Sequence, residues 1–166
     1  MSCSLRPVGR AHRARLEQLT RATGLFRKEE VATAVELLDE SLAGDEDYQF
    51  LGAFDDAQLV GYACWGPTPG TKATSDLYWI VVDRERQNTG VGSQLLREVE
   101  QRLRADGRRL VVVETSSRAD YAPTRDFYET RGYARTATIP GYYAPGDDLV
   151  IFTKDLTNGE LARAAP

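Results

Sequence analysis

Residues 76–104 read D-L-Y-W-I-V-V-D-R-E-R-Q-N-T-G-V-G-S-Q-L-L-R-E-V-E-Q-R-L-R, and this stretch decides the fold. The apolar, β-rich run Leu77–Val82 predicts a strand that stops at the charged turn Asp83–Arg86. Directly after Gly90 and Gly92 the pattern predicts an amphipathic helix, because its apolar residues recur at helical spacing. These residues are Leu95, Leu96, Val99 and Leu103. The stretch therefore predicts a strand that passes through a glycine turn into a helix.

A strand that turns through glycines into a helix N-terminus makes a site for an anion. The first amide groups of a helix have no partner inside it, and the helix dipole adds about half a positive charge there. Gly90 and Gly92 lack a Cβ, so a phosphate can reach those amides closely. Arg84, Arg86 and Gln87 are available as side-chain donors. The alternative is a connection whose glycines only relieve backbone strain.

Two common nucleotide-binding motifs are absent from the sequence. The dinucleotide fingerprint G-x-G-x-x-G needs a third glycine where Leu95 stands, and the P-loop needs a Gly-Lys pair that occurs nowhere in the chain. An anion at this turn is therefore bound by a different scheme.

The segment resembles the signature of the GNAT superfamily of N-acetyltransferases, in which [Q/R]-x-x-G-x-[G/A] follows a strand and opens a helix. Here the motif reads Q-N-T-G-V-G at Gln87–Gly92, with Asn88 where a glycine is common, and F-Y-E-T-R-G-Y at Phe127–Tyr133 resembles a second family segment. The resemblance implies acetyl-CoA as cosubstrate, with its pyrophosphate in the glycine turn and its pantetheine arm along the preceding strand. The implied cofactor-binding residues are Ile80, Val81, Val82, Gln87, Asn88, Thr89, Gly90, Val91, Gly92, Ser93, Ser117 and Tyr128.

Composition limits the class of protein. A chain of 166 residues predicts one domain, residues 1–156, with a C-terminal tail, residues 157–166. The net charge of −4 argues against a general nucleic-acid binder. Cys3 and Cys64 lie far apart and His12, expected to be an exposed helix residue, is the only histidine, so we expect neither a disulfide framework nor a metal site.

No apolar run approaches the about 20 residues of a membrane-spanning helix, and the first residues lack the apolar core of a signal peptide. We therefore expect a cytoplasmic protein with no membrane or nucleic-acid partner. The oligomeric state stays open, with a homodimer as one option.

The remaining pattern predicts the other elements of one α/β (α+β) mixed sheet. Strands are expected at Leu5–Val8, Tyr48–Phe54, Gln58–Trp65, Leu77–Val82, Arg109–Thr115, Tyr133–Ile139 and Leu149–Lys154. Helices are expected at residues 10–23, from Arg27 to Gly44, after Gly92 and at Tyr121–Thr130, with loops at Gly66–Gly70 and Pro140–Asp148. The order β-α-α-β-β-β-α-β-α-β-β, with helices on both faces, matches a GNAT-like fold in a single domain.

Acyl transfer from a thioester to an amine poses two proton-transfer problems: the amine must lose a proton, and the departing thiolate leaves more easily when it is protonated. The resemblance implies that Tyr128 lies beside the thioester sulfur, where its phenol can assist the departing thiolate; the alternative is a packing role with the hydroxyl bonded to coenzyme A. Asp76, at the start of the central strand, and Glu114, at the end of a buried strand, are candidate bases for the amine. The alternative for Asp76 is a residue in solvent at the start of its strand, and the alternative for Glu114 is a hydrogen-bonded cap at the end of its strand. A backbone N–H near Ile80–Val82 is expected to stabilise the developing oxyanion.

The sequence therefore predicts an N-acetyltransferase that moves an acetyl group from acetyl-CoA to a primary amine by direct attack in a ternary complex. A small molecule or amino-acid derivative is the favoured acceptor. One alternative is a protein N-terminal or lysine acetyltransferase, and another is a non-catalytic domain that binds acyl-CoA to sense it.

Overall fold

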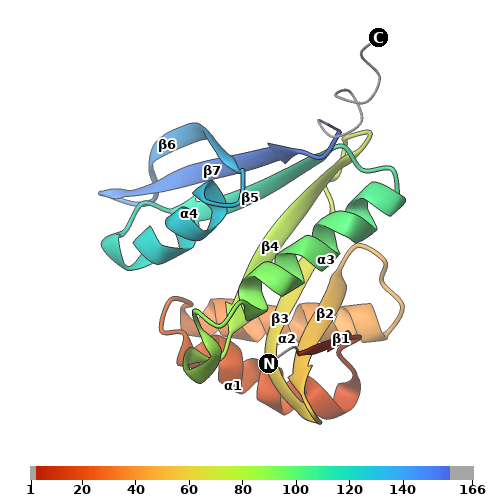
Figure 1. Ribbon diagram of the computed structural model, residues 1–166. Helices are drawn as coiled ribbons and strands as arrows, with labels where there is room; N and C mark the ends of the chain where they lie inside the picture. The colour runs from red at the N-terminus through yellow and green to blue at the C-terminus, as the bar shows by residue number, and fades with distance from the viewer. Residues whose placement is uncertain (1–2, 158–166) are drawn as a thin grey trace. The chain divides into compact units, whose positions relative to one another are not determined.

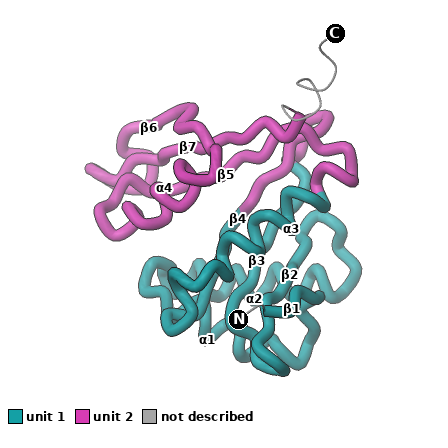
Figure 2. Tube along the Cα trace, viewed as in Figure 1, with its two compact units in different colours: residues 1–67, 78–102 teal, residues 68–77, 103–166 magenta. Residues whose placement is uncertain are grey.

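The computed structural model describes residues 3–157, and their contacts group the chain into two units (Figure 2). Unit 1 comprises residues 1–67 and 78–102, and unit 2 comprises residues 68–77 and 103–166. Apart from short 3-10 turns, the element order is the predicted β-α-α-β-β-β-α-β-α-β-β (Figure 1). All but the first residue of the predicted tail lies outside the described residues.

The strands of unit 1 are largely antiparallel. Strand β1 (Ser4–Arg6) pairs with β2 (Gln49–Asp55), and β2 pairs with β3 (Gln58–Pro67). The hairpin between β2 and β3 turns at Asp56, whose φ of +51° lies in the left-handed region. Because β3 continues to Pro67, the loop predicted to start at Gly66 begins two residues later.

Helices α1 (Arg13–Ala22) and α2 (Lys28–Leu42) pack against one face of these strands. The helical spacing of Val31, Val35, Leu38 and Leu42 predicts an inward-facing stripe on α2, and of these residues Val31, Val35 and Leu38 are buried and Leu42 is partly buried. The shared core consists of Val8, Leu16, Leu19, Val35, Leu38, Phe50, Phe54, Leu59, Tyr62, Cys64 and Val81.

Polar groups inside this core are paired. The Tyr62 hydroxyl is hydrogen bonded to the Thr20 hydroxyl (2.6 Å) and accepts a bond from the Trp79 indole (3.0 Å). His12, predicted to be an exposed helix residue, lies in the 3-10 helix Arg10–His12 but is half-buried rather than exposed. Its Nδ1 accepts a hydrogen bond from the Gly9 amide (2.9 Å), and its ring packs edge-on against Phe54, with centroids 4.8 Å apart.

Helix α3 (Val91–Ala105) follows the glycine turn as predicted. Its apolar face is confirmed, because Leu95, Leu96, Val99 and Leu103 are all at most 3% exposed. A Cβ added to Gly61 on β3 would meet Val91 and Leu95 of α3, so this helix lies against β3. Gly61, which pairs with Ala53, is the neighbour of Tyr62 on β3, and Tyr62 belongs to the core beneath α1 and α2. Because neighbouring side chains of a strand point to opposite faces, α3 lies on the face opposite α1 and α2.

We expect Gly61→Ala to lower the free energy of unfolding by about 1–3 kcal/mol. The added Cβ would stand 2.9 Å from the Val81 carbonyl oxygen, a backbone atom that cannot rotate away, and 3.3 Å from Val91. Urea denaturation would measure the loss, with Gly9→Ala as the control because its Cβ finds nothing closer than 3.8 Å. Equal stabilities for the two variants would contradict the packing of α3 on β3.

In unit 2, the first residues of β4 (Thr74–Val82) pair in parallel with β5 (Leu110–Ser116), as a strand–helix–strand order around α3 predicts. Strand β5 pairs antiparallel with β7 (Asp147–Asp155), and β7 pairs with β6 (Ala134–Ala144). Helix α4 (Ala122–Glu129) follows a 3-10 turn, and Pro123 lies in its first turn. Hydrogen bonding joins the strands in the order β1-β2-β3-β4-β5-β7-β6.

The loop predicted at Pro140–Asp148 is instead the end of a long hairpin. Strand β6 continues to Ala144 and β7 begins at Asp147, so only two residues connect them. Strand β6 pairs only with β7 and is the last strand of the order, and an edge strand tolerates a proline such as Pro140 because one side of it needs no donor. No helix formed by residues 3–157 is long and apolar enough to cross a membrane.

Candidate functional site

The strand-to-helix connection of unit 1 begins with a short 3-10 turn, Arg84–Arg86, capped by Asp83. The Asp83 carboxylate accepts a hydrogen bond from the Glu85 amide (3.1 Å), and the Asp83 carbonyl accepts one from the Arg86 amide (2.8 Å). The Asp83 amide donates to the Val60 carbonyl on β3 (2.8 Å). The turn is therefore fixed to the sheet at its first residue.

The glycine turn itself is exposed and adopts backbone conformations that its sequence permits. Asn88 and Gly90 have φ values of +60° and +93°, which asparagine tolerates and glycine adopts freely. Nothing lies within 4 Å of the place where a Cβ on Gly90 would stand. The Gln94 amide donates to the Gly90 carbonyl (2.9 Å), and the amides of Val91 and Gly92 come before this bond at the start of the helix. An anion can therefore approach the start of α3.

The predicted pantetheine-binding strand leads directly into this turn. Val81 is buried in the unit 1 core, whereas Ile80 and Val82 are only partly buried. The Gln87 side chain donates to the Val82 carbonyl (3.4 Å), and the Thr89 hydroxyl donates to the Arg86 carbonyl (2.5 Å). Unit 1 thus brings together the predicted residues from Ile80 to Ser93 on one continuous strand, turn and helix start.

Tyr128, on α4 in unit 2, is 3% exposed and packs among aromatic rings. Its ring centroid lies 5.2 Å from that of Phe127, 5.3 Å from that of Tyr133 and 6.3 Å from that of Phe152. Burial raises the pKa of its phenol well above the ordinary value of about 10. Its hydroxyl makes no hydrogen bond within residues 3–157, so a protonated donor remains for a ligand.

The two candidate bases share a face of the unit 2 strands. Asp76 on β4 pairs with Val112 on β5, and Glu114 lies two residues further along β5, so all three side chains point to the same side. Glu114 is exposed, yet partial desolvation by the protein around it, and then the negative charge of Asp76, raise the pKa of its carboxyl. A carboxylate with a raised pKa is a stronger base near neutral pH.

Tyr128 and Glu114 lie on opposite faces of these strands. Glu114 pairs with Ile151 on β7, whereas the next residue, Phe152, pairs with Val113 and packs against Tyr128. Because successive side chains of a strand point to opposite faces, Glu114 points away from α4.

Two further residues of unit 2 have contacts near this region. Ser117, a predicted cofactor ligand, accepts a hydrogen bond on its hydroxyl from the Asp148 amide (2.8 Å) and donates its own amide to the Asp148 carbonyl (2.9 Å). It therefore joins β5 to β7. Sequence reasoning missed Tyr143 as a neighbour of Glu114: burial, and then Glu114, raise the pKa of Tyr143 to about 12. The hairpin that carries Tyr143 was predicted to be a loop, so no signal linked the two residues.

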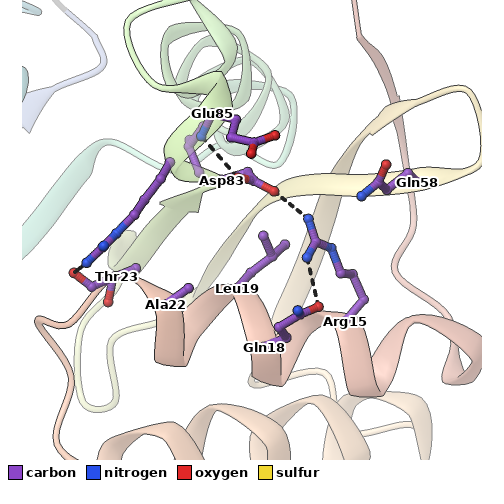
Figure 3. Close-up of a pocket in the computed structure, with 10 residues that line it drawn as sticks. Arg15, Gln18, Leu19, Ala22, Thr23, Gln58, Asp83 and Glu85 are labelled. Atoms are coloured by element: carbon purple, nitrogen blue, oxygen red, sulfur yellow. Dashed lines mark hydrogen bonds and ion pairs between the residues drawn. The ribbon is translucent and has the colours of Figure 1, made fainter.

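A cavity of about 350 Å³ in unit 1 lies between α1 and the capped turn (Figure 3). Its lining residues are Arg15, Gln18, Leu19, Ala22, Thr23, Gln58, Val82, Asp83, Arg84 and Glu85. Among the described residues, no three His, Cys, Asp or Glu side chains gather as metal ligands would.

Comparison with known proteins identifies the family. A model of the acetyltransferase (GNAT) family matches residues 14–133. The chain belongs to this family. A solved structure of a GNAT-family protein from Desulfovibrio desulfuricans is 40% identical in sequence, with a TM-score of 0.88, and the match covers 93% of this chain and 99% of that one. This GNAT protein is therefore an acyltransferase by family.

More distant relatives show the fold or share part of the sequence. The crystal structure of an aminoglycoside 6'-N-acetyltransferase complexed with coenzyme A is 19% identical, with a TM-score of 0.76, and covers 92% of this GNAT protein and 97% of its own chain. The S-(2-succino)cysteine N-acetyltransferase of Bacillus subtilis is 26% identical over 72 residues. That match spans 43% of this chain and 44% of the relative, so the chain covers less than half of the relative's length.

Proposed function

We propose that this GNAT protein transfers the acetyl group of acetyl-CoA to a primary amine, with a small molecule or amino-acid derivative as acceptor, by direct attack in a ternary complex. The observation that carries the proposal is the exposed glycine turn at the start of α3, which leaves room over Gly90 for the diphosphate of acetyl-CoA. The relatives named for N-acetylation, one of them in complex with coenzyme A, support the same chemistry.

The start of α3 fits the diphosphate of the donor. Its first amides, the helix dipole and the open approach over Gly90 favour a negatively charged group there. In the proposal, the residues of unit 1 that hold the donor are Ile80, Val81, Val82, Gln87, Asn88, Thr89, Gly90, Val91, Gly92 and Ser93. The thioester supplies an activated acetyl group, whose carbonyl oxygen accepts a hydrogen bond from a backbone amide of β4 as negative charge develops.

The acceptor must lose a proton before it attacks. A lysine-like ammonium has a pKa of about 10.4, so only about 1 molecule in 2,500 is neutral at pH 7, a cost of roughly 4–5 kcal/mol. Glu114 is the proposed base, and Asp76 supports it by raising its pKa. Glu114 takes the first proton from the ammonium and releases it to solvent, so that the neutral amine attacks the thioester carbonyl. The N–C bond then forms, the C–S bond breaks, the second amine proton passes to Glu114, and coenzyme A leaves as a thiolate.

We expect Glu114→Gln to lower kcat/KM by about a hundredfold, because a general base contributes about 10²–10⁴-fold. The wild-type pH profile should lose activity as the pH falls through the pKa of Glu114, at a pH above the ordinary glutamate value of about 4.3. Asp76→Asn should move that acid limb to lower pH, because it removes a negative charge that raises the pKa. An acid limb that persists unchanged in Glu114→Gln would contradict the assignment.

A panel of amines with detection of the released thiol tests the proposed reaction. We expect thiol release with one or more small primary amines, together with an acetylated product of matching mass. Release only with peptides or proteins would contradict the small-molecule acceptor and favour a protein acetyltransferase. Binding of acetyl-CoA without turnover of any amine would favour a sensing domain.

A further inference from the structure

The guanidinium of Arg15, on α1, joins three parts of unit 1 (Figure 3). Its Nε donates to the Leu59 carbonyl at the start of β3 (3.1 Å), and its Nη1 donates to the Gln18 side chain on α1 (2.8 Å). Its Nη2 forms an ion pair with the Asp83 carboxylate. Both side chains are largely buried, with 25% of Arg15 and 21% of Asp83 exposed, so water screens this pair less than one on the open surface.

Asp83 links Arg15 to the strand-to-helix connection. One carboxylate oxygen binds Arg15, and the other accepts the hydrogen bond from the Glu85 amide (3.1 Å). The same residue accepts from the Arg86 amide on its carbonyl (2.8 Å). Arg15 thereby holds the residue that caps the turn just before the Q-N-T-G-V-G segment.

Two more contacts anchor the same turn. The Arg84 side chain donates to the Thr23 carbonyl at the end of α1 (3.4 Å), and Arg86 forms an ion pair with Asp55 at the end of β2. The sequence predicted that Arg84 and Arg86 are available to donate hydrogen bonds to a phosphate. In the structure, both side chains instead bind other residues of unit 1. The charged turn works as an anchor, and the exposed backbone after it is left to bind the anion.

We propose that Arg15 is a positioning residue for the donor-binding turn: through Asp83 it fixes the backbone that leads into the amides at the start of α3. This role rests on the proposed function, because it presumes that those amides bind the diphosphate of acetyl-CoA. The physical reason is that a turn held in its binding conformation before the ligand arrives loses less conformational entropy on binding. Arg15 touches no reacting atom, so its loss weakens donor binding and leaves the chemical step intact.

The test compares Arg15→Met with Arg13→Met. Arg13, on the same helix, forms a surface ion pair with Asp39 on α2 (2.8 Å), and its side chain makes no hydrogen bond or ion pair with the turn among residues 3–157, so its removal controls for the loss of one α1 arginine. We expect Arg15→Met to raise the Kd for coenzyme A about tenfold, with kcat at saturating acetyl-CoA within about twofold of wild type. Arg13→Met should leave both values unchanged.

Amide hydrogen exchange gives a readout that does not depend on the ligand. Exchange at residues 84–92 should become faster in Arg15→Met and stay at the wild-type rate in Arg13→Met. Arg15→Lys keeps the positive charge beside Asp83 and should recover part of the affinity, which keeps the test usable if Arg15→Met folds poorly. Asp83→Asn combined with Arg15→Met should weaken binding by less than the product of the two single effects.

An unchanged Kd in both Arg15→Met and Arg15→Lys would overturn the positioning role and leave Arg15 as a contact that only holds α1 to β3. A fall in kcat without a change in Kd would also overturn it. Wild-type protein that binds no coenzyme A would instead refute the proposed function, and the positioning role with it. The wild-type measurement therefore distinguishes the two failures.

Discussion

Gly90→Val is expected to weaken the binding of acetyl-CoA by about a hundredfold, equivalent to about 2.8 kcal/mol. Two effects act together at this position. A Cβ would occupy the open approach to the first amides of α3, and a β-branched residue resists the φ of +93° that the turn requires. Isothermal titration with acetyl-CoA or coenzyme A would measure the loss.

Gly44→Val separates blocked binding from backbone strain. Gly44 ends α2 in the same unit, has a φ of +102° and likewise has nothing within 4 Å of a would-be Cβ. It should lose a similar amount of stability, on the order of 1–2 kcal/mol, while its affinity for the donor stays at the wild-type value. Equal affinities for the two variants would contradict the diphosphate site at the start of α3.

Tyr128→Phe is expected to lower kcat by about a hundredfold, while the affinity for acetyl-CoA changes by less than about threefold. A free thiol has a pKa of about 8.5, well below that of the buried phenol, so complete proton transfer from Tyr128 to the leaving thiolate is uphill. The expected role is a hydrogen bond from the phenol to the sulfur, which strengthens as the C–S bond breaks. Steady-state kinetics at saturating donor would measure the effect.

Tyr133→Phe is the matched control for this variant. Tyr133 is also buried, at 4% exposed, and its ring lies 5.3 Å from that of Tyr128. Tyr128→Phe should keep the wild-type stability to within about 0.5 kcal/mol, because the Tyr128 hydroxyl makes no hydrogen bond within residues 3–157 that the substitution would remove. If both variants kept the wild-type kcat, the assignment of Tyr128 to the leaving group would be wrong.

The elements that the sequence predicted best are those set by local spacing. The apolar face of α3 and the stripe of α2 follow helical periodicity, and both are buried as expected. Gly44 and Gly107 end their helices with positive φ, the conformation that glycine adopts most easily. Such patterns depend on neighbours a few residues away, so one sequence is enough to read them.

The features that the sequence did not reveal depend on contacts between distant residues. The sequence predicted no particular role for Arg15, because its partners Leu59 and Asp83 lie far along the chain. The β6–β7 hairpin was predicted to be a loop because Pro140 and Gly141 are typical of turns, whereas an edge strand accommodates both. The raised pKa of Glu114 could not be predicted from the sequence, because it depends on the register that brings Asp76 on β4 close to β5.

The central claim is that the start of α3 binds acetyl-CoA, and thermal unfolding with added acetyl-CoA tests it most directly. At a hundred times its Kd, a ligand that binds only the folded state stabilises it by about 2.7 kcal/mol. For a protein of this size the midpoint of unfolding should rise by roughly 5–10 °C. We expect that rise in the wild type with acetyl-CoA, little change with NAD or ATP, and little change with acetyl-CoA in Gly90→Val. An unshifted wild-type midpoint at every concentration of acetyl-CoA, or an equal shift in Gly90→Val, would contradict the account.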